Sequence, residues 1–221
     1  MTILTENIYF PAIESADQSG LLAIGGDLSP ERLLLAYRSG IFPWYSEGDP
    51  ICWWTPDPRF VLFPQELKVS KSMKQVIDRN KFVFTINQSF AEVISNCKNV
   101  SRNGQDGTWI SDDMGAAYIN LHQLGYAHSA EAWLGAELVG GLYGIRLGNI
   151  FFGESMFSHR SNASKFAFIK YVEQLQKENV QMIDCQLHTN HLESLGARMI
   201  SRREFKKQLK EIGDVRFMIC L

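Results

Sequence analysis

Three apolar, strand-like segments follow one another closely in the middle of the chain, at residues 127–134, 138–147 and 150–157. Short glycine-containing turns separate them, and such connections join neighbouring antiparallel strands. A helix from about Ala163 to Glu178 and a buried strand then follow. Antiparallel strands, a helix, a strand and a further helix predict a layered α/β or α+β fold, and they argue against a doubly wound sheet.

The buried strand is expected over residues 180–187, and it carries two polar side chains, Asp184 and Gln186. The strand period of two puts both on the same face. Because it is costly to desolvate a charge within an otherwise apolar strand, Asp184 needs a fixed partner or a chemical function. Two structural explanations stay open for this acid, namely the capping of a loop and an ion pair with Lys165 or Arg198.

The first part of the chain predicts a separate unit. Ser29-Pro30-Glu31 is typical of a helix start, and Gly40 ends that helix. Between Phe42 and Pro64 the chain holds five prolines and three tryptophans, which favours a rigid aromatic segment over a helix. We therefore expect a small N-terminal domain at residues 1–62 and a larger domain with a mixed sheet at residues 63–221.

Serine caps predict four further helices, which begin after Ser70, Ser89, Ser111 and Ser201. Strands are expected at residues 82–86 and 215–220. The second of these strands would close the chain.

Size and charge exclude several classes of protein. The 221 residues carry a formal net charge of −2, so a broad affinity for nucleic acid phosphates is not expected. The chain contains no apolar run near the ~20 residues that a membrane span needs, and its first residues lack the basic start of a signal peptide. We expect a cytoplasmic protein with reduced cysteines and no bound metal, because the four cysteines lie far apart.

Any contact with RNA must therefore be local. The candidate surfaces are Arg202, Arg203, Lys206, Lys207 and Lys210 on the last helix, and Lys68, Lys71, Lys74, Arg79 and Lys81 earlier in the chain. Helical spacing puts the first set on one face. A solvated helix surface stays open as the alternative for both sets.

Several blocks of sequence carry a further signal. The main ones are residues 151–158 (Phe-Phe-Gly-Glu-Ser-Met-Phe-Ser), 163–165 (Ala-Ser-Lys), 184–186 (Asp-Cys-Gln) and 194–197 (Ser-Leu-Gly-Ala). Others precede them at residues 21–29, 40–44, 53–59, 108–110, 127–129 and 138–144. In this order the blocks closely resemble the leucyl/phenylalanyl-tRNA–protein transferase family, and only the two ends of the chain fall outside the resemblance.

This resemblance implies a GNAT-like acyltransferase fold for the larger domain. It also implies transfer of leucine, phenylalanine or, less readily, methionine from the 3′ end of Leu-tRNA, Phe-tRNA or their methionyl counterpart. The acceptor would be the α-amino group of a protein that begins with Arg or Lys, which marks that protein for degradation by the N-end rule. An ester becomes an amide in this reaction, so positioning is the main requirement, and no covalent nucleophile or cofactor is expected. Cys185, which strand alternation turns away from Asp184 and Gln186, is accordingly expected to be structural.

The resemblance further implies roles for individual residues. Asp184 and Gln186 would form the catalytic pair, in which Gln186 engages the amine or the ester. Asp184 would hold Gln186 and favour a cationic acceptor. Glu154 would attract Arg or Lys as well, and its structural alternative is an ion pair with Lys165.

The other positions would hold the aminoacyl-adenosine end of the tRNA. The residues that resemble the apolar pocket of the family are Leu142, Phe151, Met156 and Tyr171, the last in place of an apolar aromatic residue. Trp44 and Trp109 would stack on the terminal adenosine. Tyr37 and Tyr118 would frame the same place. Core packing stays open as the alternative for these apolar and aromatic residues.

Two other functions stay open. An acyl-CoA-dependent N-acyltransferase would seat a pyrophosphate in a glycine-rich turn before a helix, but residues 158–163 contain no glycine. A non-catalytic module that binds peptide N-termini or tRNA would use Asp184 and Glu154 for recognition only.

Overall fold

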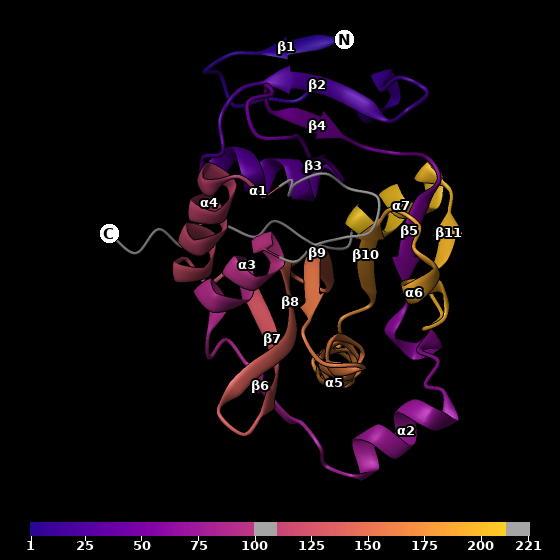
Figure 1. Ribbon diagram of the computed structural model, residues 1–221. Helices are drawn as coiled ribbons and strands as arrows, with labels where there is room; N and C mark the ends of the chain where they lie inside the picture. The colour runs from indigo at the N-terminus through magenta and orange to yellow at the C-terminus, as the bar shows by residue number, and fades with distance from the viewer. Residues whose placement is uncertain (100–109, 211–221) are drawn as a thin grey trace.

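Two β-sheets organise the protein, which is known from a computed structural model that describes residues 1–99 and 110–210 (Figure 1). The smaller sheet has the strand order β1-β2-β4-β3. Its strands are β1 (Thr2–Leu4), β2 (Leu21–Gly25), β3 (Phe42–Pro43) and β4 (Cys52–Trp54). β1 pairs with β2 in parallel, and the other pairs are antiparallel. Helix α1 (Pro30–Arg38) connects β2 to β3.

The larger sheet has seven strands in the order β11-β5-β10-β9-β8-β7-β6. They are β5 (Arg59–Leu62), β6 (Val83–Ile86), β7 (Ala127–Leu134), β8 (Glu137–Leu147), β9 (Ile150–Ser158), β10 (Met182–Gln186) and β11 (Arg198–Ile200). Only the β9–β10 pair is parallel among the described pairs of this sheet. The expectation of a layered α+β fold with a mixed sheet and a smaller N-terminal part is confirmed.

Helices cover both faces of the larger sheet. They are α2 (Lys71–Asp78), α3 (Phe90–Asn99), α4 (Asp112–Gln123), α5 (Ala163–Lys177), α6 (Asn190–Glu193) and α7 (Arg202–Leu209). Consecutive residues of β9 show the two faces: Phe151 belongs to a buried cluster with α5, whereas Phe152 belongs to the cluster that includes α1, α3 and α4. The second cluster also contains residues of the smaller sheet, so one core joins the two sheets.

Local sequence signals explain most helix starts. The side chains of Ser29, Ser70, Ser111 and Ser201 each accept a hydrogen bond from a backbone N–H of the helix that follows. The predicted meander is confirmed as β7, β8 and β9, and the predicted long helix as α5. The strand expected at residues 215–220 lies outside the described residues.

The expected division of the chain after residue 62 stays a prediction. Strand β5, which ends at Leu62, pairs with β10 and β11 in the larger sheet. The segment that leads from the smaller sheet into β5 therefore belongs to both parts of the structure. This connection brings Arg59 next to β10.

A gap opens within the larger sheet between β9 and β10. The two strands pair only from Ile150 to Phe152 and from Met182 to Asp184. Beyond these pairs β9 continues along β8 to Ser158. A register shift between Asp184 and Gln186 also disturbs the pairing of β10 with β5. Side chains of both strands therefore face the space that the interrupted pairing leaves.

Candidate active site

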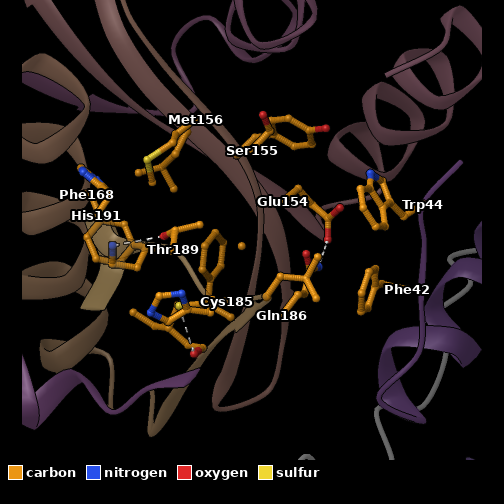
Figure 2. Close-up of a pocket in the computed structure, with 18 of the residues that line it drawn as sticks. Phe42, Trp44, Glu154, Ser155, Met156, Phe168, Cys185, Gln186, Thr189 and His191 are labelled. Atoms are coloured by element: carbon orange, nitrogen blue, oxygen red, sulfur yellow. Dashed lines mark hydrogen bonds between the residues drawn. The ribbon is translucent and has the colours of Figure 1, made fainter. Parts of the chain in front are cut away.

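A cavity of about 700 Å³ lies where β9 and β10 separate (Figure 2). Its walls come from β3, β8, β9 and α5, and from the end of β10 with the segment that follows. Figure 2 shows Glu154, Gln186, Trp44 and Phe42 on one side and Met156, Phe168 and His191 on the other. The cavity therefore combines a polar and aromatic wall with a largely apolar one.

Asp184 is completely buried and forms an ion pair with Arg59. Arg59 Nε donates to Oδ1 at 2.9 Å, and Nη2 donates to Oδ2 at 2.7 Å, so the pair is bidentate. The guanidinium lies over the rings of Phe42 and Phe205, at 4.7 and 4.8 Å from their centroids. The cation that pairs with Asp184 is thus Arg59, and not Lys165 or Arg198.

Gln186 is held at both its backbone and its side chain. Its φ of 62° lies in the left-handed region, which is unusual for a residue other than glycine. The backbone N–H donates to Asp184 Oδ1 at 2.9 Å, and side-chain Nε2 donates to Glu154 Oε1 at 2.9 Å. Asp184 therefore fixes the local conformation that directs the Gln186 amide at the polar wall.

The expected alternation along β10 is wrong at its end. Cys185 lines the same cavity as Gln186, whereas Asp184 is not among the lining residues. The register shift and the positive φ of Gln186 account for this difference, since both interrupt the period of two. Burial raises the pKa of the Cys185 thiol far above its ordinary value, so the thiol is protonated at neutral pH.

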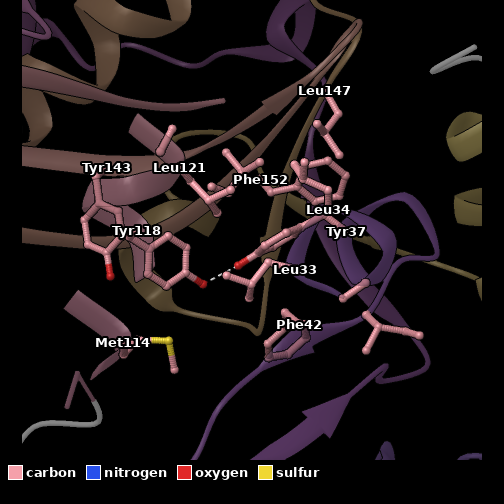
Figure 3. Packing of buried hydrophobic residues seen from close by; sticks show 14 of the residues in the cluster. Leu33, Leu34, Tyr37, Phe42, Met114, Tyr118, Leu121, Tyr143, Leu147 and Phe152 are labelled. Atoms are coloured by element: carbon pink, nitrogen blue, oxygen red, sulfur yellow. Dashed lines mark hydrogen bonds between the residues drawn. The ribbon is translucent and has the colours of Figure 1, made fainter. Parts of the chain in front are cut away.

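Glu154 lies on β9 and accepts three hydrogen bonds. Tyr37 Oη donates to Oε1 at 2.7 Å and Tyr118 Oη donates to Oε2 at 3.0 Å, while Gln186 donates to Oε1. The two tyrosine hydroxyls also hydrogen-bond each other (Figure 3). Burial raises the pKa of Glu154 to about 7, and it raises the pKa of both tyrosines well above their ordinary value.

Tyr37 and Tyr118 lie in the core that joins α1 and α4, and both are completely buried (Figure 3). Their hydroxyls support Glu154 from behind the cavity wall. Lys165 is not a partner of Glu154 in the structure, because the hydrogen bonds of this carboxylate go to the two tyrosines and Gln186.

The residues expected at the apolar wall fall into two groups. Leu142, Phe151 and Met156 line the cavity. Tyr171 does not, and its ring packs edge-on against Phe151 with centroids 5.0 Å apart. Tyr171 thus supports the wall from the α5 side.

Trp44 lines the cavity and keeps 36% of its surface exposed, so one side of its indole is accessible. Its ring lies against Trp54, with centroids 5.8 Å apart, and its carbonyl accepts a hydrogen bond from the Trp54 indole at 2.7 Å. Trp109, the other expected stacking residue, lies outside the described residues.

Several lining residues were not singled out from the sequence. They include Phe42, Phe168, Ile183, His188, His191 and Leu192. Phe168 and Ile183 read as ordinary core residues of a helix and a strand, and the two histidines follow β10 in a segment without a recognisable pattern. Only their position at the gap in the sheet separates them from other core or surface residues.

The basic residues of α7 lie on a separate surface. Lys206 pairs with Glu14, and Arg202 Nη2 donates to the Thr55 carbonyl at 2.9 Å. The other three, Arg203, Lys207 and Lys210, are exposed. The expected basic residues on and around α2 are exposed as well.

The described residues also bear on metal sites and membrane spans. No cluster of three or more His, Cys, Asp or Glu side chains within residues 1–99 and 110–210 is arranged to hold a metal ion. None of the helices in these ranges has the length and apolar character needed to cross a membrane.

Comparison with known proteins identifies the family. Residues 61–210 match the family described as leucyl/phenylalanyl-tRNA protein transferase, and residues 26–57 match the N-terminal domain of the same family. The leucyl/phenylalanyl-tRNA–protein transferase of Flavobacterium johnsoniae is 57% identical over 210 residues, which cover 95% of this chain and 99% of the relative. That of Christiangramia forsetii is 58% identical over 202 residues, covering 90% and 95% respectively. The chain belongs to the leucyl/phenylalanyl-tRNA–protein transferase family.

Among solved structures, a GCN5-related N-acetyltransferase from Kribbella flavida is similar with a TM-score of 0.39 at 7% identity, over 81% of this chain and 63% of that one.

Proposed function

We propose that this chain transfers leucine, phenylalanine and, less readily, methionine from the 3′ end of aminoacyl-tRNA to proteins that begin with Arg or Lys. The product would be a substrate for N-end-rule degradation in the cytoplasm. The observation that carries the proposal is the cavity between β9 and β10, in which the Gln186 amide and the Glu154 carboxyl adjoin an apolar wall. Such a site suits a reaction that joins an apolar acyl group to a cationic amine.

The chemistry requires positioning more than a reactive side chain. An aminoacyl ester is already activated, and correct placement of amine and ester is worth roughly 7–11 kcal/mol in favourable intramolecular cases. In this proposal Gln186 is a catalytic residue that holds the attacking amine against the ester carbonyl. An amide both donates and accepts hydrogen bonds, so Gln186 can engage Glu154 and the amine together.

Asp184 acts through Gln186 in this proposal. Its carboxylate is buried and occupied by Arg59, so its charge is directed at the guanidinium and not at the cavity. Its hydrogen bond to the Gln186 N–H supports a positioning role. Arg59 is then a second positioning residue, because it fixes the orientation of the Asp184 carboxylate.

The walls of the cavity suit the two ends of the substrates. Leu142, Phe151 and Met156 would hold the aminoacyl side chain, with Tyr171 behind them, and a flexible methionine suits side chains of different shape. Trp44 would stack on the terminal adenosine together with Trp109. Glu154, supported by Tyr37 and Tyr118, would face the cationic acceptor.

A transfer assay tests this function directly. Purified protein is mixed with labelled Phe-tRNA and a peptide that begins with Arg, and the label is expected in the peptide. The same peptide with an acetylated N-terminus is the matched control and should remain unlabelled. Leu-tRNA should replace Phe-tRNA, and acetyl-CoA should not. Failure to label the free peptide, or transfer from acetyl-CoA, would contradict the proposal.

A further inference from the structure

The three oxygen-bearing side chains at the polar wall form a closed triangle. Tyr37 contacts Glu154 Oε1, Tyr118 contacts Glu154 Oε2, and the two hydroxyls contact each other. Each of these hydrogen bonds needs one proton, so the triangle needs three. The tyrosines supply two, since a phenol carries a single proton. The third contact is completed only when the Glu154 carboxyl carries a proton.

The surroundings of Glu154 favour that proton. Burial is the main cause that raises its pKa to about 7, and the nearby charge of Asp184 acts in the same direction, whereas the hydrogen bonds lower the pKa. Within the described residues, no ion pair links Glu154 to a lysine or arginine. The titratable groups around it include Tyr37 on α1, Tyr118 on α4, Tyr143 on β8, Asp184 and Cys185 on β10, and His188 and His191 of the cavity lining.

The proposed reaction has a proton that needs an acceptor. The α-amino group of a protein has an ordinary pKa of about 7.7–8.0, so at neutral pH it arrives mainly as an ammonium ion. An ammonium ion has no lone pair and cannot attack an ester. Gln186 is not suited to remove the proton, because an amide is barely basic.

We propose that Glu154 is the catalytic residue that takes this proton, and that Tyr37 and Tyr118 are positioning residues that complete the triangle around the protonated carboxyl. This inference rests on the proposed function. Gln186 connects the binding of the ammonium group with its deprotonation. Its Nε2 donates to Glu154, so its amide oxygen is the atom that accepts from the ammonium. The acceptor nitrogen is thereby held beside the group that deprotonates it.

The proton and bond changes balance. The ammonium gives one proton to the Glu154 carboxylate and becomes a neutral amine. The nitrogen attacks the ester carbonyl carbon, so that the C–N bond forms and the bond to the 3′ oxygen of the tRNA breaks. The second proton of the nitrogen goes to that 3′ oxygen. Glu154 afterwards returns its proton to water.

The test compares two acceptors with wild-type protein and with Glu154→Gln. One acceptor is an Arg-starting peptide, and the other is its analogue with an aminooxy group in place of the N-terminal amine, which is uncharged at neutral pH. Single-turnover transfer from Phe-tRNA is measured for all four combinations. The variant should be slower by about 100-fold with the ammonium peptide, in line with the loss of a general base. With the aminooxy peptide it should approach the wild-type rate.

Other outcomes have distinct meanings. Equal slowing with both acceptors would show that Glu154 attracts the cationic side chain or shapes the cavity, and the inference would be wrong. Normal transfer by Glu154→Gln to the ammonium peptide would also overturn it. Absence of transfer by the wild-type protein to either peptide would overturn the proposed function and this inference with it.

A pH profile tests the two positioning residues. Tyr118→Phe removes one donor to the carboxylate and keeps the ring that packs edge-on against Tyr143. Loss of that hydroxyl breaks two of the three contacts of the triangle, so the pKa of Glu154 changes and the acid limb of the transfer rate should move by about one pH unit. Tyr37→Phe should also move the acid limb. A purely structural role would lower the rate equally at all pH values, and an unmoved acid limb would contradict the inference.

Discussion

Asp184 and Glu154 lie on the two strands that separate at the cavity, yet their surroundings differ in kind. Asp184 is completely buried and meets a bidentate arginine, whereas Glu154 is half-buried and meets two phenols and an amide. A cation fixes a carboxylate in its charged form, while neutral donors at a partly desolvated site allow the carboxyl to exchange a proton near neutral pH. This difference indicates a division of labour in which Asp184 sets geometry and Glu154 handles the proton.

The largest effect is expected when the buried ion pair is broken. Either Arg59→Met or Asp184→Asn leaves one charge buried without its partner, so each should lower the free energy of unfolding by about 3–5 kcal/mol. The double variant should recover much of this loss, because both charges are then gone. Urea unfolding of the four proteins forms a double-mutant cycle that measures the coupling.

The transfer rates of the same four proteins distinguish a role of the ion pair in stability from a role in positioning Gln186. The double variant should remain slow in transfer although its stability returns close to that of the wild type. The asparagine introduced at position 184 then has no arginine to fix its orientation towards the Gln186 N–H. Recovery of both stability and transfer in the double variant would show that the pair serves only the fold.

The second prediction concerns the other acid and the dependence of stability on pH. The folded protein holds the proton of Glu154 up to about pH 7, whereas the ordinary pKa of this group is 4.5. The folded state therefore binds more protons between these values, and stability from this group is lost as the pH rises through 7. The loss should reach at most about 3.5 kcal/mol, at roughly 1.4 kcal/mol per pH unit.

Urea midpoints at pH 5 and pH 8 measure this loss. Glu154→Gln should abolish the contribution of this residue to the pH dependence of stability, because glutamine does not titrate. Glu137→Gln, at the exposed start of β8, is the matched control and should behave as wild type. If the stability of Glu154→Gln depends on pH as that of the wild type does, Glu154 does not titrate near neutral pH, and the proposed contrast between Asp184 and Glu154 is wrong.

The third prediction addresses the residue that connects both acids. Gln186→Asn keeps a side chain that tolerates positive φ and keeps the backbone N–H that donates to Asp184, but the shorter amide no longer reaches Glu154. Transfer should fall by roughly 100-fold, as for a small misplacement of reacting groups, with little change in affinity for Phe-tRNA. Gln181→Asn makes the same chemical change just before β10 and should have no effect. A loss confined to tRNA affinity would make Gln186 a binding residue.

Local features of this site could be predicted from the sequence, and long-range ones could not. The meander and the capped helices follow from nearby residues, whereas the choice of Asp184, Gln186 and Glu154 as site residues rests on the resemblance to the family. The partner of Asp184 lies 125 positions earlier in the chain, and nothing in the pattern around Arg59 indicates the pairing. The bulge at Gln186 arises from the register between β10 and β5, which an isolated strand pattern does not contain.

The two tyrosines illustrate the same limit. Tyr37 and Tyr118 are 81 positions apart, and each reads as a core aromatic residue of its own helix. Their hydroxyls meet only because α1 and α4 pack together behind β9. The role around the adenosine that was expected for them stays a prediction, and in the structure Glu154 is their shared hydrogen-bond partner.

The fourth prediction separates the cavity from the basic surface. Reversal of the exposed residues Arg203, Lys207 and Lys210 to Glu should weaken binding of whole tRNA by about tenfold, because few phosphate contacts are involved. Transfer from a minimal aminoacyl-adenosine should be unchanged, since neither Asp184 nor Glu154 is touched. Equal loss with both substrates would show that α7 affects the cavity, to which Phe205 links it through Arg59.

The smallest effect is expected for Cys185→Ala. Although the thiol lines the cavity beside Gln186, its raised pKa keeps it protonated at neutral pH, and a protonated thiol is a poor nucleophile. Transfer by the alanine variant should therefore stay close to the wild-type rate. A thiol reagent at neutral pH should modify Cys185 of the wild-type protein only slowly, because the thiolate is the reactive form. An aminoacyl thioester trapped at Cys185 by acid quenching would instead assign the acyl group to sulfur, and neither Asp184 nor Glu154 would then control the rate-limiting chemistry.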